Sequence, residues 1–249
     1  MSGRASKTSA TDEVSDADRA AERIVVDMIR AAHPEDEIVS EEGGGARGRS
    51  GRRWLVDPLD GTTNYLYGNP QWCVSIACAD AEGPLAGVVY APALRELFHA
   101  ERGRGAYRVA TDPDLMAGGS APRPAAVRLR VSDATDLGLA LLADGFSYDA
   151  EERREQGRRE ALILPQVRDV RRMGSAALDL CAVASARVDA YAEAGGNEWD
   201  WAAGRLLVTE AGGRLSETAG VRPGSYTLIA SGPGIHDALA RLIASVGGL

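Results

Sequence analysis

Cysteine and histidine are scarce in this chain of 249 residues. The three cysteines are an odd number without C-x-x-C spacing, so we expect neither a disulfide framework nor a structural zinc site. We interpret them as small buried side chains, and this usage predicts a cytoplasmic protein in a reducing compartment. The three histidines are scattered, and we expect core or surface positions for them rather than catalytic roles. The residues concerned are Cys73, Cys78, Cys181, His33, His99 and His236.

An excess of basic residues and long apolar stretches are lacking as well. The formal net charge is -8, which argues against nucleic acid as the main ligand. No stretch reaches the length of a membrane span, and residues 1–12 are polar, without the apolar segment of a secretory signal. We therefore expect neither a membrane partner nor secretion. An acidic protein can still bind an anionic substrate where metal ions mask its carboxylates.

The segments that are present predict an α+β protein. Residues 16–32 have apolar side chains at helical spacing, residues 72–109 contain closely spaced apolar stretches typical of an antiparallel sheet, and strands alternate with helices farther on. A stretch rich in Gly, Pro and Ala at 112–124 separates these parts. We therefore expect two subdomains, 1–120 and 121–249.

Two regions complete this outline. In the second half, the pattern predicts strands at 127–131, 139–142, 167–171, 188–192 and 226–231 and helices at 151–164, 175–187, 201–211 and 235–246. The Gly- and Arg-rich loop at 43–53 is interpreted as a mobile lid whose arginines either are solvated or attract phosphate. Its glycines match G-x-G-x-x-G, but no helix follows them, so dinucleotide binding is not expected.

The segment 57–64, Asp-Pro-Leu-Asp-Gly-Thr-Thr-Asn, carries the most chemical information. It follows an apolar strand, and we expect Pro58 to end that strand so that Asp57, Asp60 and Thr62 lie together. Two unit charges about 4 Å apart repel by roughly 4 kcal/mol at an effective dielectric constant of about 20, and a hard cation such as Mg²⁺ would remove this cost. An Asp-Pro turn with an Asp-Gly corner is the simpler alternative for these residues taken singly.

Two helix starts farther along the chain extend this set. Asp200 lies where the N-cap of an apolar helix is expected, so it is either an ordinary cap or a further metal ligand. The segment 174–177, Gly-Ser-Ala-Ala, opens another helix after a strand. Free backbone N–H groups at such an end bind phosphate oxygens. Together with 57–64, these residues predict a site for metal and phosphate.

These motifs, in this order, resemble the inositol monophosphatase family of magnesium-dependent, lithium-sensitive sugar phosphatases. The resemblance rests on residues 54–64, 174–181 and 199–213, with 40–42 and 7–18 in support. It implies a layered α-β-α-β-α sandwich, with a mixed or antiparallel N-terminal sheet and a second α/β subregion. It also implies a homodimer and bound Mg²⁺, two or three ions. Family members generally carry a helix before the segment 7–18, so we expect weaker folding or altered dimerisation for a chain that begins there.

The resemblance also assigns roles to residues. It implies that Mg²⁺ is bound by Glu41, Asp57, the carbonyl of Leu59, Asp60 and Asp200. It implies that Thr62, with Glu41, orients and activates the attacking water. The phosphate would lie against Gly61 and Thr62, and the alcohol half would contact Gly174, Ser175, Ala176 and Glu193.

The implied reaction is hydrolysis of a small-molecule phosphate monoester. Water activated by the metal would attack phosphorus in line, without a covalent enzyme intermediate. Inositol monophosphate (myo-inositol 1-phosphate) is the first choice, because Glu193 and the turn at 174–176 suit a polyol. The alternatives within the family are histidinol phosphate, fructose 1,6-bisphosphate and 3'-phosphoadenosine 5'-phosphate.

Two other classes of protein share part of this pattern. The haloacid dehalogenase phosphatases also have an Asp-Gly-Thr motif, but Asp57 and Asp60 are three residues apart with a proline between them, and no Gly-Asp motif follows. A non-catalytic role in transcription complexes is associated with a bacterial member of the resembled family. The complete set of expected ligands favours catalysis.

Overall fold

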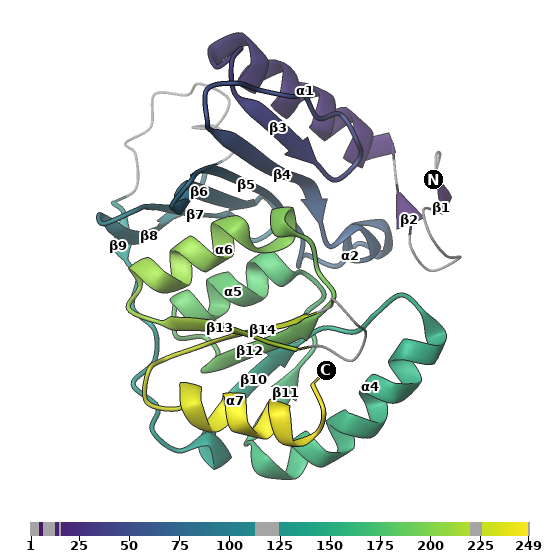
Figure 1. Cartoon of the computed structure of the whole chain (residues 1–249), viewed down its shortest axis with the longest axis vertical. Coiled ribbons are helices and arrows are strands. Elements are labelled where there is room, and N and C mark those ends of the chain that lie inside the picture. Colours follow the sequence, from purple (N-terminus) through teal and green to yellow (C-terminus); the bar gives the residue numbers. More distant parts are fainter. Residues whose placement is uncertain (1–4, 7–12, 15, 113–124, 220–225, 249) are drawn as a thin grey trace.

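The layers of the molecule alternate between helix and sheet (Figure 1). The computed structural model describes residues 5–6, 13–14, 16–112, 125–219 and 226–248. In order, the layers are helix α1 (Asp16–Ala32), a seven-stranded sheet, helices α5 (Ala176–Ala184) and α6 (Glu198–Glu210), a five-stranded sheet, and helices α4 (Ala150–Ile163) and α7 (His236–Ser245). The expected α-β-α-β-α sandwich is confirmed.

The seven-stranded sheet is mixed at one edge and antiparallel elsewhere. Its strands, in spatial order, are β3 (Glu37–Ser40), β4 (Arg53–Asp60), β5 (Cys73–Asp80), β6 (Gly83–Ala91), β7 (Glu96–Glu101), β8 (Gly105–Ala110) and β9 (Val127–Arg128). Only the pair β3–β4 is parallel among them. Helix α1 covers this parallel edge, where Val26 and Ile29 pack with Ile38 and Val56.

The five-stranded sheet combines parallel and antiparallel pairs. Its strands, in spatial order, are β11 (Asp169–Arg171), β10 (Leu141–Asp144), β12 (Ala190–Ala194), β14 (Tyr226–Ser231) and β13 (Arg214–Ala219). Strand β10 is parallel to β11 and β12, whereas β14 is antiparallel to both of its neighbours. Shorter elements are β1 (Ala5–Ser6), β2 (Glu13–Val14), the 3₁₀ turns at Leu137–Leu139 and Leu164–Gln166, and α2 (Thr62–Tyr67).

The largest core lies between the two sheets, around α5 and α6. Helix α6 packs on β4 to β8 on one side and on β13 and β14 on the other. Leu180, Trp201 and Leu207 from these helices are almost fully buried with Phe98 and Tyr191 from the two sheets. This core therefore fixes the N-terminal ends of α5 and α6 relative to both sheets.

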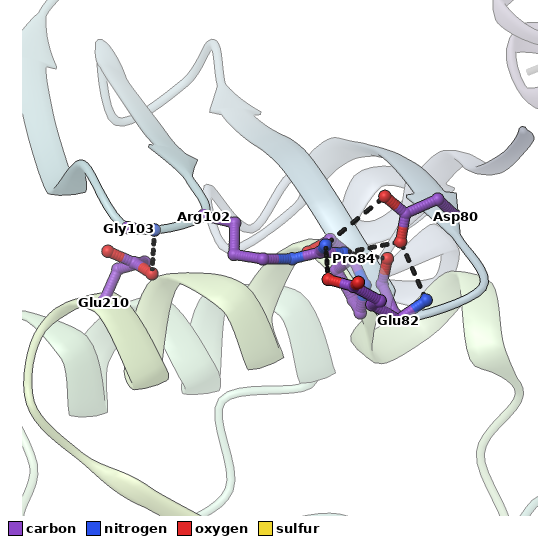
Figure 2. A network of polar contacts seen from close by, with 7 residues as sticks. Asp80, Glu82, Pro84, Arg102, Gly103 and Glu210 are labelled. Carbon is purple, nitrogen blue, oxygen red and sulfur yellow. Dashed lines mark hydrogen bonds and ion pairs between the residues drawn. The ribbon is translucent and has the colours of Figure 1, made fainter.

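The other end of α6 is tied to the hairpins of the first sheet (Figure 2). The carboxylate of Glu210 accepts hydrogen bonds of 2.7 Å from the backbone N–H groups of Gly103 and Gly105. The neighbouring Arg102 donates to Asp80 at 2.8 Å and to Glu82 at 3.1 Å. These bonds join the β5–β6 and β7–β8 turns to the helix, so they restrain its position along the sheet.

The expected end of the strand before the acidic motif was wrong. Strand β4 continues through Pro58 to Asp60. The register of β4 against β5 shifts between Asp57 and Asp60, and a proline without an N–H group is tolerated at such an irregularity. Helix α2 then begins at Thr62, a short helix that the sequence analysis did not predict. Both carboxylates still lie at the end of the strand.

Two further strands differ from expectation. The segment expected as a strand at 127–131 is a strand only at Val127–Arg128, and it pairs with β8 of the first sheet rather than with the second sheet. Strand β13 was not predicted. The low-complexity stretch 113–124 lies outside the described residues, and the division of the chain near residue 120 stays a prediction.

The loop at 43–53 packs against neighbouring elements and does not line the cavity described below. Ala46 forms a bridge with Ile38, the N–H of Gly44 donates to Glu22 at 3.1 Å, and Arg49 forms an ion pair with Glu35. These contacts hold the loop to α1 and β3, so the structure gives no support to a lid.

The structure places the cysteines and His236, which the sequence analysis expected outside the site. All three cysteines are free and buried. His236 is buried between the hydroxyls of Ser216 and Ser231, each 2.9 Å from a ring nitrogen, which is a structural position. Within the described ranges, no helix is long and apolar enough to cross a membrane.

Candidate active site

Residues from both halves of the chain line one cavity of about 950 Å³. All of the residues expected at a metal and phosphate site contribute to its wall: Glu41, Asp57, Leu59, Asp60, Gly61, Thr62, Gly174, Ser175, Ala176, Glu193 and Asp200. They come from the ends of β3, β4 and β12 and from the starts of α2, α5 and α6. The structure therefore brings together side chains that are up to 159 residues apart, from Glu41 to Asp200.

The acidic side chains at one end of the cavity are oriented by local donors. Asp57 accepts a hydrogen bond of 2.9 Å from the N–H of Leu59. Asp60 accepts bonds of 2.7 Å from the Ser175 hydroxyl and from the N–H of Ala177. These bonds reach only one oxygen of each carboxylate, Oδ1 of Asp57 and Oδ2 of Asp60. The bonds to Asp60 also join the end of β4 to the start of α5.

The helix starts use their donors differently from what the sequence suggested. Ser175 is the N-cap of α5 and accepts from the N–H of Leu178 at 3.3 Å. Because the N–H of Ala177 binds Asp60, this helix end holds a carboxylate of the protein itself. Asp200 is not the N-cap of α6 as expected. Asn197 is the N-cap, and Asp200 lies in the first turn of the helix, where it accepts a 2.6 Å bond from the N–H of Asn197 as part of a capping box.

The carboxyl groups raise one another's pKa values. Burial, followed by the charges of Glu41, Asp60 and Asp200, raises the pKa of Asp57 well above its usual range. Burial raises the pKa of Asp60 to about 7, although its bonds from Ser175 and Ala177 act in the opposite direction. Burial is also the main reason why the pKa of Asp200 is raised, and the charges of Asp60 and Glu41 add to it. Neighbouring positive charge would relieve this repulsion.

The chemistry of these groups fits a hard divalent cation, although they are not a finished metal site. Among the residues that the structure describes, no three acidic, histidine or cysteine side chains are already arranged to hold one ion. The charges of Glu41 and Asp60 nevertheless act on both Asp57 and Asp200, so these carboxylates lie within electrostatic reach of one another. Oxygen donors alone are the set that Mg²⁺ prefers. A bound cation would draw these carboxylates together.

Thr62 is paired with an acidic residue that the sequence analysis did not select. Its hydroxyl lies 2.8 Å from Oδ1 of Asp18 and 3.1 Å from the carbonyl of Leu59. A hydroxyl has only one proton to donate. The Asp18 carboxylate is both nearer and the stronger acceptor, so the hydroxyl donates to Asp18 rather than to the Leu59 carbonyl. Asp18 is fully buried on the same face of α1 as Val26 and Ile29. A buried acidic residue on an apolar helix face was the available signal. The predicted partnership of Thr62 with Glu41 stays a prediction.

Gly61 and Asn64 fix the turn that carries Thr62. Gly61 has a φ of 92°, and a Cβ atom there would lie 2.8 Å from the carbonyl oxygen of Gln71. The side-chain amide of Asn64 donates to the carbonyls of Gln71 at 2.7 Å and of Met173 at 2.8 Å. This amide therefore connects the acidic motif with the segment that precedes α5.

The other end of the cavity is formed by β12 and α4. Glu193 accepts a 2.9 Å hydrogen bond from the hydroxyl of Tyr191. Burial raises the pKa of Glu193, against the effects of this bond and of the nearby charge of Arg172. Helix α4 and the segment before it add wall residues that the sequence analysis did not select, namely Phe146, Ser147, Tyr148, Asp149, Glu151, Glu152, Glu155, Gln156 and Arg159. Apart from Phe146, this part of the wall is polar or charged.

The layered fold and the acidic cavity define a protein of the phosphatase class. Comparison with known proteins gives its family. A sequence profile described as "Inositol monophosphatase family" matches residues 2–247. The chain is 40% identical over 249 residues to the protein named "Inositol-1-monophosphatase SuhB" of Mycobacterium tuberculosis, covering 98% of this chain and 82% of that relative. The chain therefore belongs to the inositol monophosphatase family.

Two further relatives carry different names. The "Nus factor SuhB" of Xylella fastidiosa is 40% identical over 250 residues, covering 95% of this chain and 83% of that protein. The solved structure of an IMPase from Thermotoga maritima is 32% identical, with a TM-score of 0.81, and the match covers 98% of this chain and 88% of that one. The fold is thus shared with solved members, while the names of the relatives differ.

Proposed function

We propose that this protein is a Mg²⁺-dependent phosphatase of small phosphate monoesters, with myo-inositol 1-phosphate as its favoured substrate. The observation that carries the proposal is that Glu41, Asp57, Asp60 and Asp200 line one cavity together with Thr62, whose hydroxyl bonds to Asp18. The name of the Mycobacterium tuberculosis relative, an inositol-1-monophosphatase, supports the choice of myo-inositol 1-phosphate. Histidinol phosphate, fructose 1,6-bisphosphate and 3'-phosphoadenosine 5'-phosphate are the alternatives.

The acidic end of the cavity would hold the metal. The residues that would bind two or three Mg²⁺ ions are Glu41, Asp57, Asp60 and Asp200, with the carbonyl of Leu59. When bound, Mg²⁺ would activate water and offset the negative charge on the phosphoryl and leaving oxygens. The existing hydrogen bonds to Asp57, Asp60 and Asp200 would hold their carboxylates in orientation while the remaining oxygens turn toward the ions.

Thr62 and Asp18 would handle the proton of the attacking water. Since the Thr62 hydroxyl donates a hydrogen bond to Asp18, the lone pairs of the hydroxyl oxygen can accept a hydrogen bond from a water molecule in the cavity. As the new O–P bond forms, the water proton can pass through this hydroxyl to the Asp18 carboxylate. The bond from phosphorus to the alcohol oxygen breaks, and that oxygen takes a proton from solvent. The products are the free alcohol and inorganic phosphate.

The other end of the cavity would receive the alcohol. The Glu193 carboxylate can accept hydrogen bonds from hydroxyl groups, and its orientation is fixed by the Tyr191 hydroxyl. Gly174, Ser175 and Ala176 line the same cavity as this carboxylate. A compact polyol fits this arrangement, because a carboxylate that accepts hydroxyl protons discriminates against analogues that lack them.

Phosphate release from the four candidate esters, measured side by side with and without Mg²⁺, tests the proposal. We expect hydrolysis only with the metal, fastest for myo-inositol 1-phosphate, and inhibition by lithium. Preference for another ester would overturn the choice of substrate, and no release from any ester would overturn the phosphatase. Light scattering in solution would test the proposed homodimer, since a monomer at all concentrations contradicts it.

A non-catalytic role in transcription complexes is the second candidate. It is supported by the name of the Xylella fastidiosa relative, a Nus factor. The same assay separates the two candidates, because an interaction role alone predicts no Mg²⁺-dependent phosphate release. A protein that releases phosphate in this assay supports the first.

A further inference from the structure

A second pair of carboxyl groups lies behind the cavity, apart from the acidic end. Asp144 ends strand β10 and is 1% exposed, and Glu160, on helix α4, is 9% exposed. All four of their carboxyl oxygens are buried, and no hydrogen-bond donor from the part of the chain that the structure describes reaches them. Two buried carboxylates without donors would be costly. Something must therefore neutralise one of them.

A proton is the neutralising group that this geometry accommodates. The two carboxyls are close enough to form a hydrogen bond with each other, which requires a proton on one of them. Burial, then the charge of Glu160 and its bond, raises the pKa of Asp144 to about 8. Burial is also the main reason why the pKa of Glu160 is raised. With one proton, one carboxyl group donates a hydrogen bond and the other accepts it, so one oxygen of each group has a partner.

This pair is directly behind Glu193. Strand β10 is parallel to β12, with Asp144 beside Ala192, the residue before Glu193. At Gly145, the residue after Asp144, an added Cβ atom would lie 2.0 Å from the carboxyl carbon of Glu193. The carboxyl of Glu193 therefore occupies the space that a side chain at position 145 would take. A charge on the pair acts on Glu193 at short range.

The charged groups around the pair come from each neighbouring element. Asp144 is influenced by Glu160 from α4, by Glu193 from β12 and by Arg172, which follows β11. Asp179, from α5, is influenced by Asp144 and Glu193 in turn. The Tyr191 hydroxyl faces Glu193 from its own strand. Arg172 is the positive group among those that influence Asp144, so a second negative charge on the pair would have little compensation.

We propose that Asp144 and Glu160 share one proton and thereby act as positioning residues for Glu193, holding its carboxylate ready to accept hydrogen bonds from the alcohol half of the substrate. The inference rests on the proposed role of Glu193 in the phosphatase. With the proton in place, Glu193 keeps its charge and its bond to Tyr191. When the proton leaves, the added negative charge repels the Glu193 carboxylate and weakens the hydrogen bonds that it accepts from substrate hydroxyl groups.

Amide variants imitate the protonated pair. In Asp144→Asn the side-chain amide donates to the ionised Glu160 carboxylate, and in Glu160→Gln the amide of residue 160 donates to the ionised Asp144 carboxylate. Either variant keeps the shape of the pair and removes the shared proton, and if one variant fails to fold, the other can still be measured. Asp169→Asn is the matched control, because Asp169 is an exposed carboxylate on the neighbouring strand β11 that forms an ion pair with Arg171.

The first measurement is a carboxyl titration of the full chain by ¹³C NMR with Mg²⁺ present. We expect a carboxyl titration near pH 8 that is present in the wild type and in Asp169→Asn and is lost in Asp144→Asn. The Glu193 resonance should shift at the same midpoint in the wild type and not in Asp144→Asn. Absence of this titration in the wild type would overturn the proposal.

The second measurement is kinetic and uses myo-inositol 1-phosphate between about pH 6.5 and 9.5. We expect KM of the wild type and of Asp169→Asn to rise about five- to tenfold relative to Asp144→Asn across this range, with kcat changed less than about twofold. An equal rise of KM in Asp144→Asn would overturn the positioning role. If the wild type hydrolyses no ester, the proposed function fails, and the coupled shift of the Glu193 resonance alone decides this inference.

Discussion

The two ends of the cavity solve the same electrostatic problem in different ways. At the acidic end, Asp57, Asp60 and Asp200 each accept a hydrogen bond from a backbone N–H group, and their shared charge calls for a cation. Behind the other end, Asp144 and Glu160 receive no such donor from the described residues and can share a proton instead. Hydrogen bonds lower the pKa values of Asp60 and Asp200 against the effect of burial, whereas Asp144 and Glu160 have only each other.

The largest effect that would test this comparison is at the acidic end. In Asp57→Asn we expect kcat/KM for the favoured ester to fall about a thousandfold, because a metal ligand that acts in the transition state is lost. We also expect the variant without metal to melt higher than the wild type, since burial and three neighbouring charges raise the pKa of Asp57. Unchanged phosphate release would mean that this carboxylate holds no essential ion.

A smaller loss is expected at Thr62. Replacing it with alanine should lower kcat about a hundredfold, while Thr62→Ser, which keeps the hydroxyl, should recover most of the activity. Because Thr62 and Asp18 share a hydrogen bond of 2.8 Å, the double variant Thr62→Ala/Asp18→Asn should be no worse than the poorer single variant. If the losses of kcat in the two single variants add up in the double variant, the two residues act independently, which would contradict the proposed pair.

The alcohol end should respond mainly in substrate binding. In Glu193→Gln we expect KM for myo-inositol 1-phosphate to rise about tenfold, with a smaller change in kcat, because a charged acceptor becomes a neutral amide. Asp169→Asn, which changes an exposed carboxylate to an amide, should leave both constants as in the wild type. A fall in kcat alone in Glu193→Gln would place this residue with the chemistry rather than with the alcohol.

The smallest effect is on stability and depends on pH. The pKa of Asp144 in the folded protein is about 8, compared with about 3.9 in an unfolded chain. A raised folded pKa means that stability is fully present below about pH 4 and is lost progressively as pH rises toward 8. Between about pH 5 and 9, thermal melting of the wild type should therefore fall more than that of Asp144→Asn. Parallel melting curves would show that the pair does not take up a proton on folding.

The sequence by itself determined the acidic motif and the approximate place of most elements. The segment 57–64 and Asp200 supply the carboxylates of the proposed metal site, and the sequence could predict them because their residue types are close in the chain or lie at the start of a strong helix pattern. Helix α1 is at the expected residues for the same reason, since apolar spacing within one helix is local information.

Only the tertiary structure decided which distant groups meet. Asp18 reaches Thr62 across 44 residues, Asp144 meets Glu160 behind Glu193, and β9 joins the first sheet. Each of these contacts depends on which faces are buried together, and burial is a property of the packed layers rather than of local spacing. The chemistry of the residues could therefore be predicted from the sequence, but the choice between a cation and a proton required their neighbours in space.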